Sequence, residues 1–290
     1  MIKLENTEVI GWEAAIRGMR NPMNSLAQSD SFCKPSTENC CGCHSHDKCA
    51  YIFESTGKPY RRDIGPNDFD LMKRLRNAGT DHRKFMRMIT VYADIIAPLY
   101  WWKEFDTYKV GTVANSCSTM HKIADKEFTL EDFSHEHLID DAPTEDMVKE
   151  LKDNVSGLDD YSEAQRMKNG YFYYNDETGY LAQAVPYGKS RINTFFYSPK
   201  NVLTTFIIPV LNANREAYLK TKDKSYWWQM IQLLPSSYNQ RRTVMLNYEV
   251  LANMYRSRKN HKLDEWHTFC DWIKALPYSE LITGKEENDG

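Results

Sequence analysis

Towards the C-terminal end of the chain, polar side chains recur at helical spacing among apolar ones. Asn247, Leu251 and Arg258 fall on one stripe of a helix that the pattern predicts over residues 237–258. An amide and a guanidinium on a half-buried face need partners, so this stripe indicates a binding site. The alternative is that Arg258 only complements the helix dipole within the basic run 256–262. Under either interpretation, this stretch requires a helix that packs on a hydrophobic core.

The remaining periodicity predicts further helices and two early strands. The strands are expected over residues 7–10 and 88–96. The other helices are expected over residues 13–19, 68–79, 99–109, 143–155, 202–220, 225–233 and 263–276. The polar tail 284–290 is expected to be flexible.

A segment rich in tyrosine and phenylalanine interrupts this helical pattern. Strands are predicted over residues 171–174, 180–185 and 191–197, with turn residues between them. Exposed tyrosines supply large amphipathic contact areas, so this meander is a candidate lid or oligomer contact. Its alternative is an additional β-layer on the main core.

Cysteines are concentrated in one short stretch, where five of the seven lie between Cys33 and Cys49. Cys40 and Cys43 have the Cys-x-x-Cys spacing that presents two thiolates to one tetrahedral ion, and Cys33 and Cys49 can complete the site. These four cysteines therefore form a candidate structural zinc site, with unliganded thiols as the alternative. The haem-attachment pattern Cys40-x-x-Cys43-His44 is disfavoured, because that chemistry needs export.

Composition bounds the class of protein. With 41% hydrophobic residues among 290, the chain can bury a substantial core. A net charge of −3 and a pI near 6.3 argue against general nucleic-acid binding, which needs a dominant basic face. No apolar run approaches the roughly 20 residues of a membrane-spanning helix, and the N-terminus lacks a hydrophobic signal core. We therefore expect a cytoplasmic protein with no membrane partner.

Independent catalytic motifs are not visible in the sequence. It contains no P-loop, no Gly-rich dinucleotide fingerprint and no Ser-His-Asp order. His82, His121 and His261 are possible acid–base groups, and a structural role explains each of them equally well.

Three segments resemble the flavin-dependent thymidylate synthases. The family has a Leu-Pro, then a helix of the pattern Asn-x-Arg-x-Leu-x-Asn that ends in Leu-x-Leu-Arg. The matching residues here are Leu234-Pro235, Asn247, Leu251, Asn253 and Arg258. The family order of helix, Gly turn, strand and Ala-Pro before a further helix is matched by residues 71–75, Gly79, 88–96, Ala97-Pro98 and 99–109. Residues 115–121, Asn-Ser-Cys-Ser-Thr-Met-His, are similar to the family's Asn-Glu-x-Ser-x-Arg-Tyr.

Departures from the family pattern fall on its functional residues. The family's Arg-His-Arg positions hold Thr107, Tyr108 and Lys109. Its substrate-phosphate arginines correspond to Met120 and Ile231, which cannot pair with a phosphate.

Two further positions have become acidic. Glu104 occupies the position of the base-contacting glutamine, and Glu249 replaces the arginine between the two family asparagines. Such reversals suggest a ligand different from that of the family, or none.

The resemblance implies an α+β fold, with a mixed or antiparallel sheet and flanking helices. We expect one elaborated domain over residues 1–283, to which a Cys/His-rich loop at 33–49 and a β-hairpin insertion at 168–200 are added. The family's homotetramers, with sites shared between subunits, imply a homo-oligomer here.

The resemblance also implies roles for individual residues. Arg258 and Ser118 are the candidate catalytic residues, and together with Glu104 they would bind the substrate. The residues expected to hold FAD are Lys109, Asn115, Asn247 and Asn253. The implied activity is transfer of a one-carbon unit to uracil C5 of dUMP, with methylenetetrahydrofolate as donor and NADPH as reductant. The alternative is a non-catalytic or retasked nucleotide-binding or interaction protein on the same scaffold.

Overall fold

The computed structural model describes residues 2–33, 62–140, 144–146, 149, 153, 171–174, 181–187 and 191–284. The chain divides into two compact units. The helical unit comprises residues 97–102 and 117–240 together with Met1, and the sheet unit comprises residues 2–96, 103–116 and 241–290. Each unit is described by itself below. The expectation of one elaborated domain over residues 1–283 stays a prediction.

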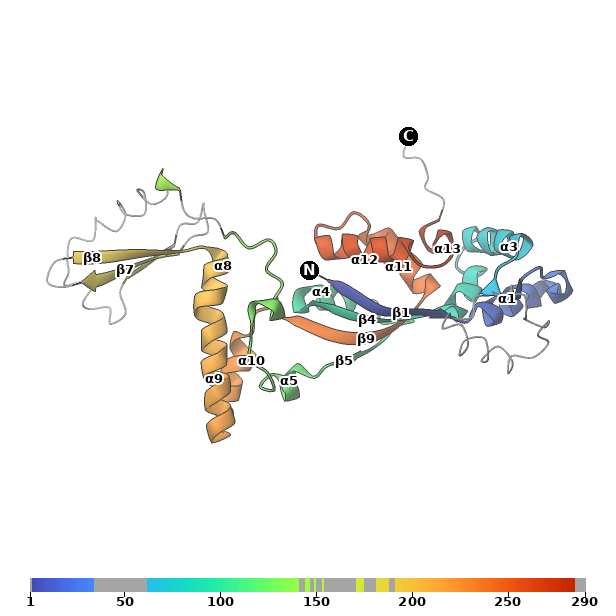
Figure 1. Cartoon of the computed structure of the whole chain (residues 1–290). Coiled ribbons are helices and arrows are strands. Elements are labelled where there is room, and N and C mark those ends of the chain that lie inside the picture. Colours follow the sequence, from blue (N-terminus) through green and yellow to red (C-terminus); the bar gives the residue numbers. More distant parts are fainter. Residues whose placement is uncertain are drawn as a thin grey trace, which may run out of the picture. The chain divides into compact units, whose positions relative to one another are not determined.

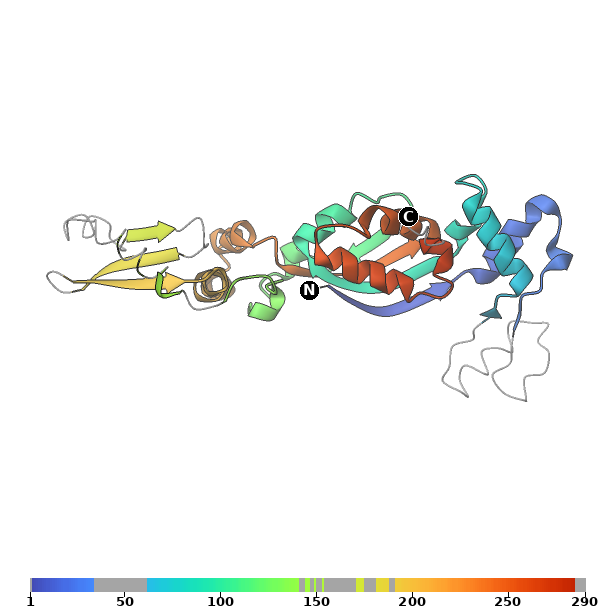
Figure 2. The same cartoon turned by 90° about the horizontal axis from the view of Figure 1, so that it is seen from above.

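A four-stranded sheet forms the centre of the sheet unit, in the order β1-β4-β9-β5. The strands are β1 (Lys3–Ile10), β4 (Thr90–Pro98), β9 (Asn239–Asn247) and β5 (Val113–Ser116). The pairs β1–β4 and β5–β9 are antiparallel. Along β4, Val91, Ala93 and Ile95 are buried and alternate with half-exposed residues, so one face of the sheet packs inwards. The helices α11 (Tyr248–Arg258) and α12 (Asp264–Lys274) cover one face of the sheet (Figure 1, Figure 2).

The helix predicted over residues 237–258 is wrong in its first half. Residues 239–247 form β9, and α11 begins only after Asn247. The local pattern explains the difference, because Val244 and Leu246 are buried while the residues between and beside them are not, which is the period of a strand. Asn247 is consequently the N-cap of α11 and not part of a helical stripe.

Helices from the first third of the chain form a second group of elements in the sheet unit. α1 (Trp12–Arg20), α3 (Pro66–Asn77) and the 3-10 helix Arg83–Met88 contact one another. The short α13 (Glu280–Thr283), which the sequence did not predict, packs against α11. The helices predicted over residues 13–19, 68–79 and 263–276 are confirmed to within a turn.

A buried ion pair joins α1 to α3. Arg20, which is 4% exposed, donates from Nε to Oδ1 of the fully buried Asp68 at 2.5 Å. The other carboxylate oxygen accepts from the hydroxyls of Ser29 at 2.6 Å and Ser31 at 2.5 Å. Burial alone would raise the pKa of Asp68, but the hydrogen bonds from Ser29 and Ser31 and the charge of Arg20 hold it below its ordinary value.

The two chain segments that flank residues 34–61 are tied together. β2 (Phe32–Cys33) pairs antiparallel with β3 (Arg62–Asp63). Next to this pair, the Ser31 hydroxyl accepts from the Gly65 backbone N–H at 3.1 Å. The Asp30 carboxylate accepts from the first turn of α3, at 2.9 and 3.0 Å from two backbone N–H groups. The chain therefore enters and leaves residues 34–61 at one fixed place.

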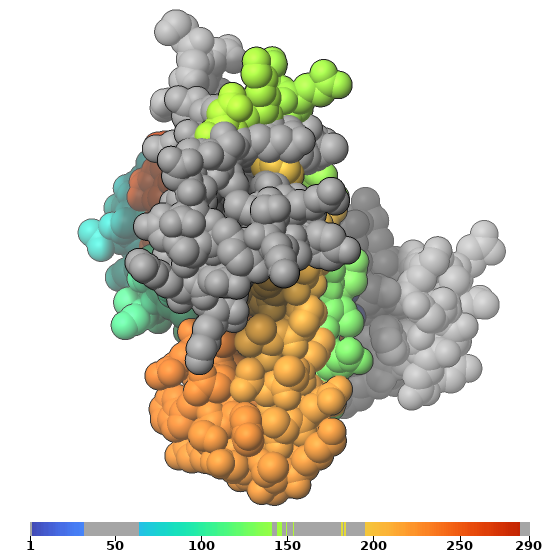
Figure 3. Space-filling model, turned by 90° about the vertical axis from the view of Figure 1, so that its left-hand side faces the viewer, coloured from blue at the N-terminus to red at the C-terminus, as the bar shows by residue number. Residues whose placement is uncertain are grey.

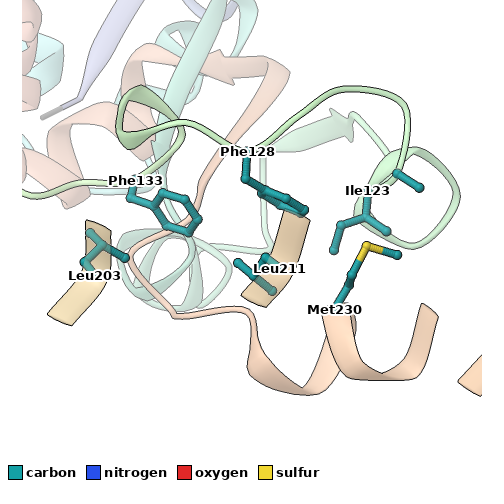
Figure 4. Close-up of a cluster of buried hydrophobic side chains, with 7 residues drawn as sticks. Ile123, Phe128, Phe133, Leu203, Leu211 and Met230 are labelled. Atoms are coloured by element: carbon teal, nitrogen blue, oxygen red, sulfur yellow. The ribbon is translucent and has the colours of Figure 1, made fainter. Parts of the chain in front are cut away.

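In the helical unit, a hydrophobic cluster gathers between a loop segment and three helical segments (Figure 4). The helical segments are α8 (Pro199–Val202) with the π-turn Leu203–Ile207, α9 (Ile208–Thr221) and α10 (Lys224–Leu233). The buried side chains are Ile123, Ala124, Phe128, Phe133, Leu203, Leu211 and Met230. The helices α9 and α10 lie side by side at the surface that Figure 3 presents.

The aromatic segment forms a three-stranded antiparallel sheet in the order β6-β7-β8. Its strands are β6 (Tyr171–Tyr174), β7 (Leu181–Tyr187) and β8 (Arg191–Tyr197). The predicted strands are confirmed, and their role as an insertion, a lid or an oligomer contact stays a prediction.

Several expectations fall outside the described residues. Cys40, Cys43 and Cys49 lie there, as do most of the helix predicted over residues 143–155 and the tail after Gly284. Among the residues that are described, no group of three or more His, Cys, Asp or Glu could hold a metal ion. None of the described helices is long and apolar enough to cross a membrane.

Candidate functional site

Glu104 is the centre of a polar cluster in the sheet unit. It lies in the last turn of α4 (Leu99–Phe105). One carboxylate oxygen, Oε2, receives three groups: Arg258 Nη1 at 2.5 Å, Trp266 Nε1 at 3.2 Å and His261 Nε2 at 3.1 Å. These groups come from the end of α11, the loop after it and the start of α12, so the cluster joins three consecutive parts of the chain to one carboxylate.

Arg258 is held on several sides. Its Nε donates to the Tyr108 hydroxyl at 2.9 Å, and its guanidinium carbon lies 4.8 Å from the ring centre of Trp266 and 5.5 Å from that of Tyr108. Stacking on aromatic faces suits the flat, delocalised guanidinium. The fully buried indole of Trp266 therefore restricts the orientation of the Arg258 guanidinium.

The protonation of His261 follows from its hydrogen bonds. The Leu263 backbone N–H donates to His261 Nδ1 at 3.1 Å, so the neutral ring carries its hydrogen on Nε2. His261 Nε2 lies 3.1 Å from Glu104 Oε2. The sequence left His261 between an acid–base and a structural role, and the structure brings it to a carboxylate.

Two hydrogen-bonding positions of the cluster stay open. In the described part of the chain, Glu104 Oε1 has no hydrogen-bond partner, while Oε2 accepts from Arg258 and Trp266 and lies 3.1 Å from His261 Nε2. The Tyr108 hydroxyl accepts from Arg258 and keeps its own hydrogen for donation. The Glu104 side chain is 33% exposed, so a ligand can reach it. The cluster thus offers one acceptor and one donor.

Asn247 has a structural role in the fold. Its Oδ1 accepts from the Val250 N–H at 2.9 Å as the cap of α11, and its Nδ2 donates to the Gly111 carbonyl at 3.4 Å. Gly111 has φ +82°, and a Cβ there would lie 2.7 Å from Asn247 Nδ2. The turn after α4 therefore packs directly on this amide, which leaves little of it for a cofactor.

The other candidate cofactor residues of the sheet unit lie apart from the Glu104 cluster. Asn253 is half-exposed on α11, accepts from Arg256 Nη2 at 3.4 Å and lines a small cavity. Asn115 is exposed on β5, where its register partner is Thr243, and Lys109 is exposed after α4. No hydrogen bond or ion pair is described between any of these three residues and Glu104 or Arg258.

Ser118 belongs to the helical unit, where it caps the single turn α5 (Thr119–Lys122). Its hydroxyl accepts from the His121 N–H at 3.3 Å. The neighbouring Met120 contributes its carbonyl, which accepts from Trp227 Nε1 at 3.0 Å. The catalytic and substrate-binding roles predicted for Ser118 stay predictions, since the hydrogen bond described for its hydroxyl is a helix cap.

The negative charge of Glu249 is neutralised by two arginines of the same chain. It is 7% exposed, accepts from Arg83 Nε at 3.3 Å and pairs with Arg87. Burial would raise its pKa, but the hydrogen bonds and charges of Arg87 and Arg83 hold it below the ordinary value. Arg241 and Arg242, possible substitutes for the missing phosphate arginines, are paired with Asp94 and Asp106 at 2.8 and 2.7 Å.

Two members of the cluster were not predicted from the sequence. Tyr108 was noted only as a departure from the Arg-His-Arg pattern, although it lies four residues after Glu104, a spacing that returns to the same side of a helical turn. No sequence pattern pointed to Trp266, because nothing near it in the sequence indicates a contact with Glu104, which lies 162 positions earlier.

Comparisons with known proteins identify the fold. No family model matches the chain, and no curated protein matches its sequence. The structure is similar to that of thymidylate synthase X (ThyX) from Helicobacter pylori with FAD and dUMP, at 12% sequence identity and a TM-score of 0.50, covering 97% of each chain. It is also similar to the UMP/dUMP methylase PolB from Streptomyces cacaoi bound with 5-Br dUMP, at 11% identity and a TM-score of 0.44, covering 98% of this chain and 95% of that one. The ThyX similarity confirms the predicted α+β fold of the flavin-dependent thymidylate synthases.

Proposed function

We propose that the protein binds a pyrimidine nucleotide through Glu104, Tyr108 and Arg258 in the sheet unit. The observation that supports this most directly is the asymmetry at Glu104, where Oε2 accepts from Arg258 and Trp266 and lies near His261, while Oε1 accepts from none of the described residues. A carboxylate oxygen held in this way is an acceptor for the imino N–H of a uracil ring. Because the protein already fixes the carboxylate, little conformational entropy is lost when the base binds.

Tyr108 and Arg258 complete the recognition of the base. The Tyr108 hydroxyl can donate its hydrogen to a ring carbonyl next to the imino group, while the positive charge of Arg258 polarises the base. The ThyX structure, solved with FAD and dUMP, supports the nucleotide as the ligand class. Thymine and uracil share this acceptor–donor–acceptor edge, whereas the cytosine edge differs at the imino position, so the site favours uracil over cytosine.

A flavin is the proposed cofactor, and the described residues fit it in part. Asn253 is half-exposed beside a cavity lined with cations, and Lys109 is exposed, so both can contact a polar cofactor. Both ends of the Asn247 amide already make one hydrogen bond inside the fold, so its second N–H is the group that it would offer to the flavin. When bound, FAD would supply the redox chemistry needed to reduce a one-carbon unit delivered by methylenetetrahydrofolate, with NADPH as the source of electrons.

Methylation of dUMP at C5 is one outcome of such a site, and a retasked nucleotide binder is the other. The second is favoured by Met120 and Ile231, which stand at the positions of the family's substrate-phosphate arginines and carry no charge. A homotetramer remains the expected assembly for either outcome.

Binding is tested by calorimetric titration of the purified protein with dUMP, UMP and dCMP. We expect dUMP to bind, dCMP to bind at least tenfold more weakly, and Glu104→Ala to lose at least tenfold in dUMP affinity, since alanine offers no acceptor to the imino N–H of the base. The control is Glu8→Ala, which removes the same side chain from an exposed position on β1. Absence of dUMP binding, or equal losses in both variants, would contradict the proposal.

The visible absorption spectrum with added FAD, followed by gel filtration, tests the cofactor. Stoichiometric flavin that travels with the protein supports the flavoprotein, and an assay of dTMP formation with folate donor and NADPH then separates the enzyme from the binder. If dUMP binds and flavin does not, the protein is a retasked nucleotide binder.

A further inference from the structure

A small cavity in the sheet unit has four cations among its nine lining residues, and no member of the Glu104 cluster lines it. Its volume is about 110 Å³, and its charged lining residues are Arg76, Arg83, Arg256 and Lys259. They come from α3, the 3-10 helix Arg83–Met88, α11 and the residue that follows α11, and the lining is completed by Ala252, Asn253, Tyr255 and the end of α13. This lining contains no Asp or Glu. Segments far apart in the sequence thus bring four positive charges to one hollow.

Arg76 is fixed in place by the end of α13. Its Nε donates to the Leu281 carbonyl and its Nη2 to the Ile282 carbonyl, both at 3.3 Å. Gly284 lies against the guanidinium with φ +81°, and a Cβ there would come within 2.4 Å of Arg76 Nη2. The glycine therefore permits a close approach that no other residue would, and Arg76 is held by packing as well as by hydrogen bonds.

The positive charges around the cavity are incompletely balanced. Glu249 accepts from Arg83 at 3.3 Å, but it also pairs with Arg87 outside the cavity lining. Burial lowers the pKa of Arg76, and the nearby charges of Arg83 and Arg256 lower it further. Like charges held this close repel, and an anion seated among them removes the repulsion.

We propose that this cavity binds a phosphoryl group. Arginine and lysine side chains around one hollow match the charge of a phosphate and the directions of its oxygens, since arginine forks donate to two oxygens at once. The half-exposed Asn253 amide adds a neutral donor at the rim.

The volume of the cavity limits the size of the group that it can hold. About 110 Å³ exceeds several-fold the ~15 Å³ that one water needs, and lies below the ~300 Å³ at which pockets for whole small ligands begin. The cavity therefore takes the phosphoryl group of a ligand whose remainder lies outside it. That group can belong to free phosphate or pyrophosphate, to a nucleotide, or to the diphosphate of a cofactor.

Inorganic pyrophosphate is the first probe, because its binding does not depend on the proposed nucleotide or flavin. Calorimetric titration of the full chain at low salt compares the wild type with Arg256→Gln/Lys259→Gln, which removes two exposed cations of the lining. The matched control, Lys3→Gln/Arg17→Gln, removes two exposed cations of the same unit that do not line the cavity. We expect saturable binding to the wild type, a loss of at least tenfold in the lining variant and less than twofold in the control.

Absence of saturable binding at millimolar pyrophosphate, or equal losses in the two double variants, would overturn the proposal. Because both variants change exposed side chains, circular dichroism of each is expected to match the wild type. Competition then identifies the source of the phosphoryl group: displacement by dUMP indicates the nucleotide, displacement by FAD indicates the cofactor, and displacement by neither indicates free phosphate. If pyrophosphate binds while dUMP does not, the function proposed above fails and this site stands.

Discussion

Replacing Arg20 with methionine leaves the carboxylate of Asp68 buried without its cation. Both side chains are removed from solvent, with exposures of 4% and 0%. The methionine keeps most of the apolar stem volume of the arginine, so the substitution removes charge and hydrogen bonds with little loss of packing.

The magnitude follows from what the carboxylate retains. Loss of one partner of a buried ion pair costs about 3–5 kcal/mol. Asp68 keeps hydrogen bonds from the Ser29 hydroxyl at 2.6 Å and from the Ser31 hydroxyl and N–H at 2.5 and 3.1 Å. These bonds place the expected decrease in the free energy of unfolding near the lower limit, at about 3 kcal/mol. The double variant Arg20→Met/Asp68→Leu buries no charge and is expected to cost about 1 kcal/mol.

Urea unfolding, followed by tryptophan fluorescence and circular dichroism, measures both changes. The reasoning requires the single variant Arg20→Met to be less stable than the double variant. A decrease below about 1 kcal/mol for the single variant, or a double variant as unstable as the sum of its singles, would refute the buried pair.

Two further predictions concern single residues. Hydrogen bonds led by that from Thr243 lower the pKa of Asp94 to about 2, so its stabilising effect is complete above about pH 4 and is lost as the pH falls towards 2. The difference in urea midpoint between wild type and Asp94→Asn should therefore shrink over that interval, and a constant difference would contradict this. Gly111→Ala should destabilise more than Gly79→Ala, by about 1 kcal/mol in urea unfolding, because only at Gly111 does the new Cβ meet Asn247 Nδ2, at 2.7 Å, while Gly79 has nothing within 4 Å. Equal effects of the two alanines would show that the contact is not formed.

Most helices and the strands β1, β4 and β6 to β8 could be predicted from the sequence, whereas β5, β9 and α13 could not. The helical spacing correctly predicted α11, but the predicted helix also included residues 239–247, which form β9. A strand buried on one face has few apolar residues, and its partners lie far away in the chain, so sequence pattern alone favoured the longer helix. The error concealed the role of Asn247 as the cap of α11, while its contact with a flavin stays a prediction.

Two residues of the candidate site were selected from the sequence, but the contacts that join them were not predicted. Glu104 and Arg258 were both selected, through the family resemblance, yet 154 residues separate them and no spacing rule connects them. Tyr108 was interpreted only as a lost histidine, and its contact with Arg258 depends on how α4 ends beside α11. Such contacts arise from tertiary packing, which local sequence does not encode.

The closed base formed by β2, β3 and the first turn of α3 has a consequence for how this chain tolerates change in length. Residues 34–61 leave and re-enter the fold across one ladder pair, Cys33 opposite Arg62. The entropy of closing a loop grows only logarithmically, so doubling its length costs only about 0.6 kcal/mol more. A change in the number of residues between Cys33 and Arg62 is therefore expected to alter the stability of the sheet and of the Arg20–Asp68 ion pair only slightly. We expect insertions or deletions between Cys33 and Arg62 to have little effect on the core of the sheet unit.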